Sequence, residues 1–192
     1  MTPKDREIVA FKDRAAFHKW LRKSFDSYTG IWMRIFKKDS AVETITYDQA
    51  VEEALCFGWI DGQRKSYDES SWIQKFTPRR SRSIWSKRNT VLVERLIEQG
   101  RMHPPGLKAV QEAKADGRWE RAYASSKDMQ IPEDFLLELR KHRKASVAFE
   151  ALGKAERYSI SFQLVNARTS ETRKNRMNVI LAKLAKAGAG KG

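Results

Sequence analysis

The chain is poor in cysteine, with Cys56 alone among 192 residues. A single cysteine forms no internal disulfide, so nothing ties the protein to an oxidising compartment. Long apolar runs are lacking too, since no stretch approaches the roughly 20 apolar residues that span a bilayer. The start, MTPKDREIVAF, is charged where a signal peptide needs an apolar core. We therefore expect a cytoplasmic protein with no transmembrane segment.

Motifs typical of common enzyme classes are also lacking. The sequence contains no G-x-x-x-x-G-K-[ST], no G-x-G-x-x-G and no G-x-S-x-G, which argues against a P-loop, a dinucleotide-binding fold and a hydrolase elbow. His18, His103 and His142 lie far from one another and from the cysteine, without the spacing of metal ligands. We expect no metal site, and a non-enzymatic protein is favoured over an enzyme.

Acidic residues are too few to balance the basic ones. The chain has 38 Lys and Arg against 24 Asp and Glu, a net charge of +14. A charge of this size favours association with polyanions or anionic membrane surfaces. Six Lys/Arg fall between Lys75 and Arg88 without an acid, and 13 against three acids follow from Arg140 onwards. One basic region is thus embedded in the chain and the other is terminal.

The hydrophobic pattern predicts an N-terminal part of mixed secondary structure. Helical spacing after Asp13 predicts one helix, and the capping-box spacing of Thr46 and Gln49 predicts the start of another. The aromatic and β-branched run 30–37 predicts a strand. The strand-like stretches around Tyr67–Ser70 predict an antiparallel hairpin, although Asp61-Gly62 offers a competing turn.

Helices are expected in the rest of the chain, at 86–99, at 104–116 and throughout from Pro132. The predicted fold class is α+β: a small antiparallel sheet with packed helices, followed by a compact C-terminal helical part. We place the α+β part at 1–128, the helical part at 129–186 and a flexible, low-complexity tail at 187–192.

Candidate reactive groups have simpler interpretations. Cys56 falls in the last turn of its helix, where the dipole disfavours a thiolate, so a small core residue is expected. Glu52 and Glu53 point about 100° apart on the same helix, so at most one of them can face Asp61 as an acid/base partner. Solvated or helix-dipole roles are the simpler interpretation for both.

The stretch 58–89 predicts one basic cleft that contains tryptophan. Most tryptophans are expected in the core, but Trp85 lies between Arg82 and Lys87, where its indole would stay partly exposed for stacking. Pro78 ends the strand pairing and presents guanidiniums suited to carboxylate or phosphate. The predicted ligand-binding residues are Trp59, Asp61, Gln63, Arg79, Arg80, Trp85, Lys87 and Asn89.

A second group of cations, Arg168, Arg173, Lys174 and Arg176, surrounds an expected turn between helices. Arg173 and Arg176 share a helix face and would repel each other without a counter-charge. We expect carboxylate partners from the N-terminal part. As an alternative, these four residues bind nucleic-acid phosphates.

Several long motifs resemble the YdeI/OmpD-associated, or bacteriocin-protection, proteins. They are GWIDGQ, FTPRR, WSK-x-N, E-R-L-I-x-x-G-R-M, G-L-x-x-V-x-x-A-K-A-D-G-R-W and a terminal T-R-x-x-R. The resemblance runs from about Trp20 to Leu184, and Ile131 to Leu184 resembles the piece by which the family is usually defined. It implies a cytoplasmic bacterial protein linked to tolerance of antimicrobial peptides and to an outer-membrane porin. It implies no catalytic residue and no cofactor.

Three functions follow as hypotheses. The first is a non-enzymatic stress or bacteriocin-protection protein whose cleft binds an anionic small molecule or an acidic protein partner. The alternative is a nucleic-acid-associated protein that uses the C-terminal cations, and weak non-specific nucleic-acid binding is expected from the net charge alone. The third is an enzyme in the same cleft with Asp61 as its acid/base group.

Overall fold

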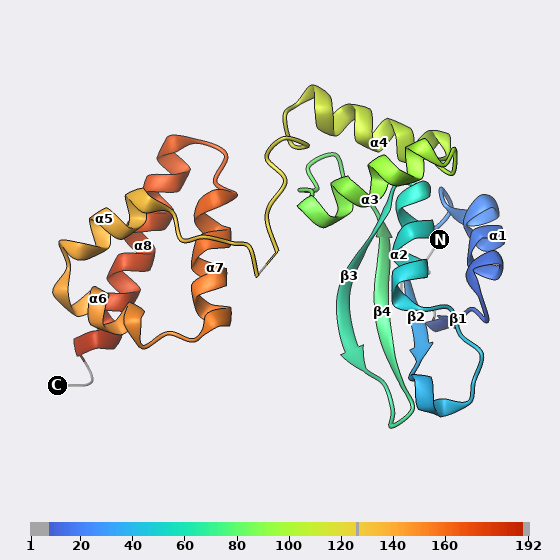
Figure 1. Ribbon diagram of the computed structural model, residues 1–192, viewed down its shortest axis with the longest axis horizontal. Helices are drawn as coiled ribbons and strands as arrows, with labels where there is room; N and C mark the ends of the chain where they lie inside the picture. The colour runs from blue at the N-terminus through green and yellow to red at the C-terminus, as the bar shows by residue number, and fades with distance from the viewer. Residues whose placement is uncertain (1–7, 126, 190–192) are drawn as a thin grey trace. The chain divides into compact units, whose positions relative to one another are not determined.

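The computed structural model of the protein describes residues 8–125 and 127–189 (Figure 1). Its described residues form two compact units. The N-terminal unit ends at Trp85 and resumes over Asn89–Glu120. The helical unit combines Ser86–Arg88 with the chain from Arg121 onwards.

A four-stranded sheet forms the base of the N-terminal unit. Its strands are β1 (Ile8–Ala10), β2 (Ile31–Phe36), β3 (Trp59–Ser66) and β4 (Ser71–Pro78), in the order β1-β2-β4-β3. The predicted α+β class is confirmed, but the sheet is mixed, because β1 pairs with β2 in parallel while the other pairs are antiparallel. Sequence patterning missed β1, since three residues are too few to show a period of two.

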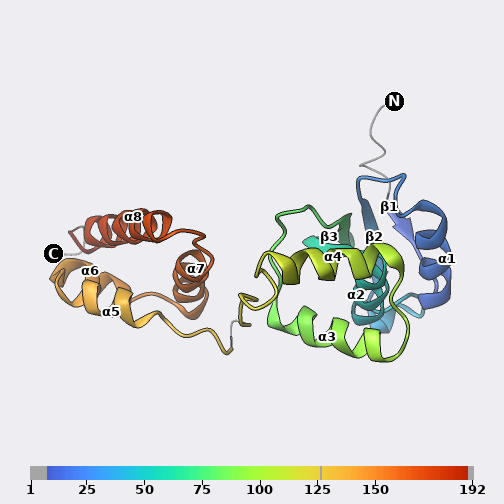
Figure 2. The same cartoon turned by 90° about the horizontal axis from the view of Figure 1, so that it is seen from above.

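Helices α1 (Arg14–Ser24) and α2 (Tyr47–Cys56) cover one face of the sheet (Figures 1 and 2). Burial alternates along strand β2, because successive side chains of a strand point to opposite faces of the sheet. Its core-facing residues Ile31, Met33 and Ile35 are buried, while the alternate positions are partly exposed. The capping box predicted at Thr46 and Gln49 is present at the start of α2.

The hairpin turns at Tyr67–Ser70, as predicted. Asp68 stabilises this turn, since its carboxylate accepts the backbone N–H of Ser70 at 2.9 Å and the hydroxyl of Ser71 at 2.7 Å. The competing Asp61-Gly62 turn is not formed. That stretch lies inside β3, where the pairing with β4 shifts register between Asp61 and Arg64.

Helix α3 (Lys87–Glu98), from Asn89 onwards, and helix α4 (Pro104–Ala115) complete the N-terminal unit. Gly106 allows the close approach of α4 to the end of α2, because a Cβ at this position would overlap the backbone carbonyl of Cys56. The glycine in G-L-x-x-V is therefore required by packing.

The helical unit consists of α5 (Glu133–Arg140), α6 (Arg143–Glu150), α7 (Lys154–Val165) and α8 (Ser170–Ala189). Helix α8 extends into the expected tail, because Gly188 brings it against the carbonyl of Lys144. Residues 190–192 of that tail lie outside the described part. Across residues 8–125 and 127–189, no helix is both long and apolar enough to cross a membrane. The helices share one core of Phe135, Leu139, Ala145, Phe149, Ile160, Leu164, Ile180, Leu181 and Leu184.

Candidate functional site

Both tryptophans of the predicted cleft are buried, each with 1% exposure. The Trp59 indole donates a hydrogen bond to the carbonyl of Phe25 at 3.0 Å. The Trp85 ring packs 4.9 Å from that of Trp119, and the Arg79 guanidinium lies 3.4 Å above it. The expectation of a partly exposed Trp85 is wrong, because these two neighbours enclose the ring.

The other predicted cleft residues have different environments. Gln63, Arg80 and Lys87 are exposed, whereas Asn89 is buried in the first turn of α3. The structure joins Asp61 to α2, since its carboxylate accepts the hydroxyl of Tyr47 at 2.6 Å. Trp59, Trp85 and Asn89 therefore offer little surface to a ligand.

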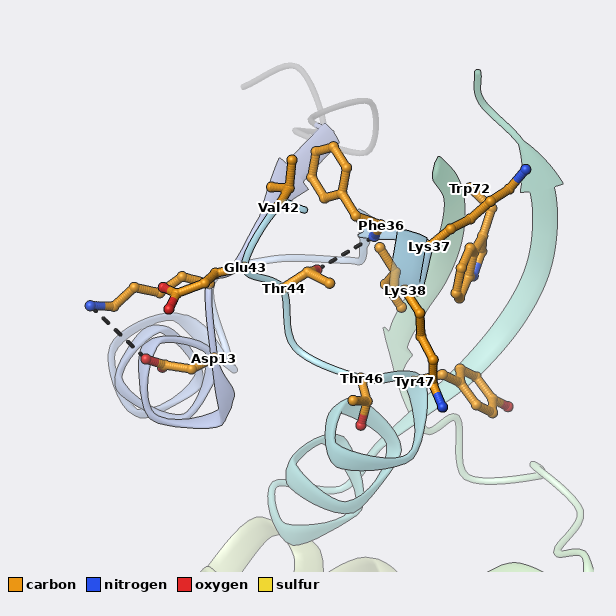
Figure 3. A pocket seen from close by; sticks show the side chains of 12 residues that line it. Asp13, Phe36, Lys37, Lys38, Val42, Glu43, Thr44, Thr46, Tyr47 and Trp72 are labelled. Atoms are coloured by element: carbon orange, nitrogen blue, oxygen red, sulfur yellow. Dashed lines mark hydrogen bonds and ion pairs between the residues drawn. The ribbon is translucent and has the colours of Figure 1, made fainter. Parts of the chain in front are cut away.

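A cavity of about 720 Å³ lies elsewhere in the N-terminal unit (Figure 3). It is formed by the two residues before α1, the end of β2, the 3₁₀ turn η1 (Lys38–Ser40) with the loop after it, the start of α2, and Trp72 of β4. None of the predicted cleft residues lines it, although Tyr47 joins it to Asp61. We call it the Trp72 pocket; its wall includes Ile35, Phe36, Val42, Tyr47, Trp72, Lys12, Lys37 and Lys38.

Local backbone features shape the Trp72 pocket. Ala41 follows the turn η1 with φ of 55°, a left-handed conformation that reverses the chain. Asp13 caps α1 by accepting the N–H of Ala16 at 2.7 Å, and Thr46 caps α2. Two helix N-termini are thereby fixed at the edge of the cavity, where the helix dipoles add positive potential.

The Trp72 pocket combines an apolar wall with a charged rim of three lysines and the carboxylates of Asp13 and Glu43 (Figure 3). Lys12 lies 4.0 Å from the Asp13 carboxylate, and Lys37 donates to the carbonyl of Glu69 at 2.7 Å. The Trp72 indole N–H is buried and has no acceptor among the described residues. With three lysines against two carboxylates, the rim has a small excess of positive charge, so the cavity suits a ligand with an apolar body and an acidic group.

Glu53 lies at the centre of an ion-pair network, with its side chain only 4% exposed. Its carboxylate accepts His18 Nδ1 at 2.8 Å and Arg101 at 2.6 Å. The solvated role expected for Glu53 is wrong, because α1 and the segment after α3 close over it. Sequence reasoning missed these ion pairs, since the partners of Glu53 are distant in the chain.

Glu52 forms the outer part of the same network. Its carboxylate contacts Arg14 at 2.9 Å, Arg95 at 2.7 Å and Arg101 at 3.0 Å. Burial alone would raise the pKa of Glu52, but the hydrogen bond from Arg101 and the charges of the three arginines outweigh it and hold the pKa below 4.5. The network therefore favours the ionised carboxylate.

This lowered pKa predicts acid sensitivity of the N-terminal unit. A carboxyl with a depressed folded pKa stabilises the protein above its unfolded pKa, and this stability is lost as pH falls through the folded value. We expect the free energy of unfolding to decline below about pH 4.5, and to decline less steeply in Glu52→Gln. Urea unfolding followed by tryptophan fluorescence at several pH values tests this, and an unchanged slope in the variant would contradict it.

Cys56 and His103 lie beside this network, and burial shifts the pKa of each. Cys56 is buried, as predicted, and burial raises the pKa of its thiol to about 12. The His103 ring stacks on Phe57 at 4.0 Å, and burial, followed by the charges of His18 and Arg22, lowers its pKa. The described ranges contain no group of three or more His, Cys, Asp and Glu placed to hold a metal ion.

The C-terminal cations divide into two pairs. Arg173 binds Asp134 of α5 at 2.7 Å, and Arg176 donates to the carbonyl of Gln163. The partner of Arg173 therefore comes from the helical unit itself, and not from the N-terminal part as expected. Arg168 and Lys174 are exposed.

A second cavity, of about 450 Å³, lies in the helical unit. Lys127, Lys154 and Arg157 line it together with Tyr158 and apolar side chains. It is smaller than the Trp72 pocket, but its lining is likewise cationic.

Comparison with known protein families gives two separate matches. Residues 9–109 match the family described as Domain of unknown function (DUF8412), and residues 128–187 match the family described as Bacteriocin-protection, YdeI or OmpD-Associated. No curated protein and no solved structure matches the chain significantly. The predicted resemblance is confirmed over 128–187, whereas GWIDGQ and FTPRR lie in the stretch matched by the first family. Since that match spans more than half of the 192 residues, the chain belongs to the DUF8412 family and carries a C-terminal domain of the bacteriocin-protection, YdeI or OmpD-associated family.

Proposed function

We propose that this chain acts in bacteriocin protection in the cytoplasm as a non-enzymatic protein, and that it binds an anionic small molecule in the Trp72 pocket. The role is supported by the family description that residues 128–187 match. The ligand class is supported by the pocket, which combines an apolar wall with three lysines against the two carboxylates of Asp13 and Glu43.

The pocket lining favours an amphipathic anion over a simple inorganic one. Ile35, Phe36 and Val42 would bury apolar surface of the ligand, which contributes roughly 25 cal/mol per Å². An acidic group at the rim would lie near Lys37 and Lys38. A small inorganic anion would satisfy the charge but leave the apolar wall in contact with water.

Protection by direct capture of a cationic bacteriocin is disfavoured. The chain carries a net charge of +14, and partners of like charge repel each other at ordinary ionic strength. Binding of a small anionic ligand instead makes the protection indirect.

The fluorescent probe 8-anilino-1-naphthalenesulfonate tests the pocket, because it is a flat apolar anion. We expect Lys38→Met to weaken its binding about 2- to 12-fold, the range for loss of one hydrogen bond or ion contact. The uncharged analogue N-phenyl-1-naphthylamine lacks the sulfonate, so its affinity should not change. Fluorescence titration of the full-length protein measures both.

Two lysine variants serve as matched controls. Lys108→Met removes an exposed charge on α4, away from the pocket lining, and should leave the affinity unaltered. Lys154→Met alters the second cavity. If Lys154→Met weakens binding and Lys38→Met does not, the anion site lies in the helical unit and the proposed site is wrong.

The protective role requires a test in cells. Bacteria that lack the protein and are complemented with the wild type should survive a bacteriocin challenge better than those complemented with Lys38→Met. If the two strains survive equally at equal protein levels, protection does not depend on the Trp72 pocket.

A further inference from the structure

The face of the sheet opposite α1 and α2 carries aromatic and basic side chains. Residues paired across neighbouring strands point to the same face of the sheet, so the strand register shows which side chains lie on this face. Lys75 pairs with Trp32, and Ile73 pairs with both Arg34 and Lys65. The open face therefore carries Trp32, Arg34, Phe36, Lys65 and Lys75 at its surface, together with Ile73, which is buried.

Trp32 lies at the centre of this open face, flanked by two ammonium groups. The Lys65 Nζ lies 4.7 Å from the centroid of its ring and that of Lys75 lies 5.8 Å away. Both lysines come from other strands than Trp32, so the three side chains converge across the sheet. Trp32 itself is partly exposed.

A second aromatic group lies toward the hairpin turn. The Arg34 guanidinium lies 4.3 Å from the ring of Phe36 and 4.8 Å from that of Tyr67. An ion pair with Asp68 at 2.6 Å fixes Arg34 in this position. Tyr67 is 48% exposed and provides a further aromatic surface near the edge of the face.

The open face has charge of one sign. None of its six positions is acidic, and the carboxylate of Asp68 at the turn is already paired with Arg34. The whole chain carries a net charge of +14. Such a surface attracts polyanions and repels cations.

We propose that this open face binds single-stranded nucleic acid, with bases stacking on Trp32 and Tyr67 and phosphates contacting Lys65 and Lys75. Single-strand binding surfaces combine aromatic platforms with cations that follow the backbone. The two ammonium groups now above Trp32 sit on flexible stems, so they can move to phosphates when a base takes their place. An acidic peptide would pair with the lysines but would leave the indole unused. A duplex hides the base faces.

The proposal is independent of the Trp72 pocket and differs from the sequence-based hypothesis. That hypothesis placed nucleic acid on the C-terminal cations. Arg173 and Arg176 there are engaged within the helical unit by Asp134 and the Gln163 carbonyl. The open face offers what those cations lack, an aromatic ring flanked by two lysines.

An oligothymidylate of about 12 nucleotides, within the usual site size, tests the proposal by fluorescence anisotropy with the full-length protein. We expect Trp32→Leu to weaken binding about 5- to 150-fold through loss of base stacking, while Trp32→Phe keeps most of the affinity. Replacing Lys65 and Lys75 together by Ser should reduce the slope of log affinity against log salt by about 1.4, or 0.7 per lost phosphate contact.

The matched control replaces Lys108 and Lys183 together by Ser, which removes the same charge from exposed sites on α4 and α8. If this control reduces affinity and slope as much as the Lys65 and Lys75 variant, net charge alone explains the binding. The proposal is also wrong if a duplex of equal length binds as tightly, or if oligoglutamate of equal charge competes equally well. If Trp32→Leu fails to fold, the proposal is tested by comparing the Lys65 and Lys75 double variant with the Lys108 and Lys183 control.

Discussion

Replacing Trp85 by Ala is expected to lower the free energy of unfolding of the N-terminal unit by about 3 to 5 kcal/mol, the range for truncating a large buried aromatic residue. The indole is 1% exposed and lies between Trp119 and the Arg79 guanidinium. Its removal leaves a cavity and also exposes a cation that now lies 3.4 Å above the ring. Urea unfolding at neutral pH measures the loss.

The Trp85→Phe variant isolates the role of the ring. The indole N–H is buried without an acceptor among the described residues, so its loss removes no hydrogen bond. We expect this variant to cost less than Trp85→Ala, because the phenyl ring refills most of the cavity that Ala would leave. The salt dependence of nucleic-acid binding should be unchanged in folded Trp85→Ala. A stable Trp85→Ala protein with weakened oligonucleotide binding would instead restore Trp85 as a stacking residue.

The parts of the fold that could be predicted from the sequence are those determined by neighbouring residues. Thr46 and Gln49 satisfy each other's backbone groups across one turn of helix, so four residues suffice to place the start of α2. The hairpin turn is likewise closed by Asp68 with Ser70 and Ser71. Strand β1 depends on pairing with β2, and its three residues carry no pattern of their own.

The errors at the candidate site arise from contacts between distant segments. Trp85 was expected at the surface because Arg82 and Lys87 flank it, yet Trp119 from after α4 covers it. The Trp72 pocket draws on the start of α1, the end of β2, the loop to α2 and strand β4. No single stretch of sequence carries the signature of such a site, because each segment contributes only a few side chains.

The availability of the cations also depends on contacts between distant segments. The sequence indicates a basic protein, but the ion pairs decide which cations remain available to a ligand. Arg173 is paired with Asp134 inside the helical unit, and Arg101 is paired with Glu52 and Glu53. Lys65 and Lys75 are placed over the Trp32 ring, on the open face of the sheet, where none of the six positions named above is acidic. The net charge predicts that the partner is an anion. The ion pairs within the protein determine which basic surface remains available to bind it.

Glu53 carries the most buried charge of the network, and its neutralisation is expected to have a large effect. Glu53→Gln keeps the volume but leaves the positive groups of Arg101 and Arg14 with one fewer counter-charge. Removing one partner of a buried ion pair costs 3 to 5 kcal/mol. Since the side chains of Arg101 and Arg14 are 28% and 37% exposed, water offsets part of this cost, and we expect about 3 kcal/mol.

Tryptophan fluorescence is suited to this measurement, because all six tryptophans of the chain lie in the N-terminal unit. The matched control Glu94→Gln removes an exposed carboxylate from α3 and should change the free energy of unfolding by less than about 0.5 kcal/mol. If the Glu53 carboxylate did not join these segments, Glu53→Gln and Glu94→Gln would change the free energy of unfolding by similarly small amounts. A loss confined to Glu53→Gln instead identifies its carboxylate as the group that joins α1, α2 and the segment after α3, since His18 and Arg101 contact it from those two sides.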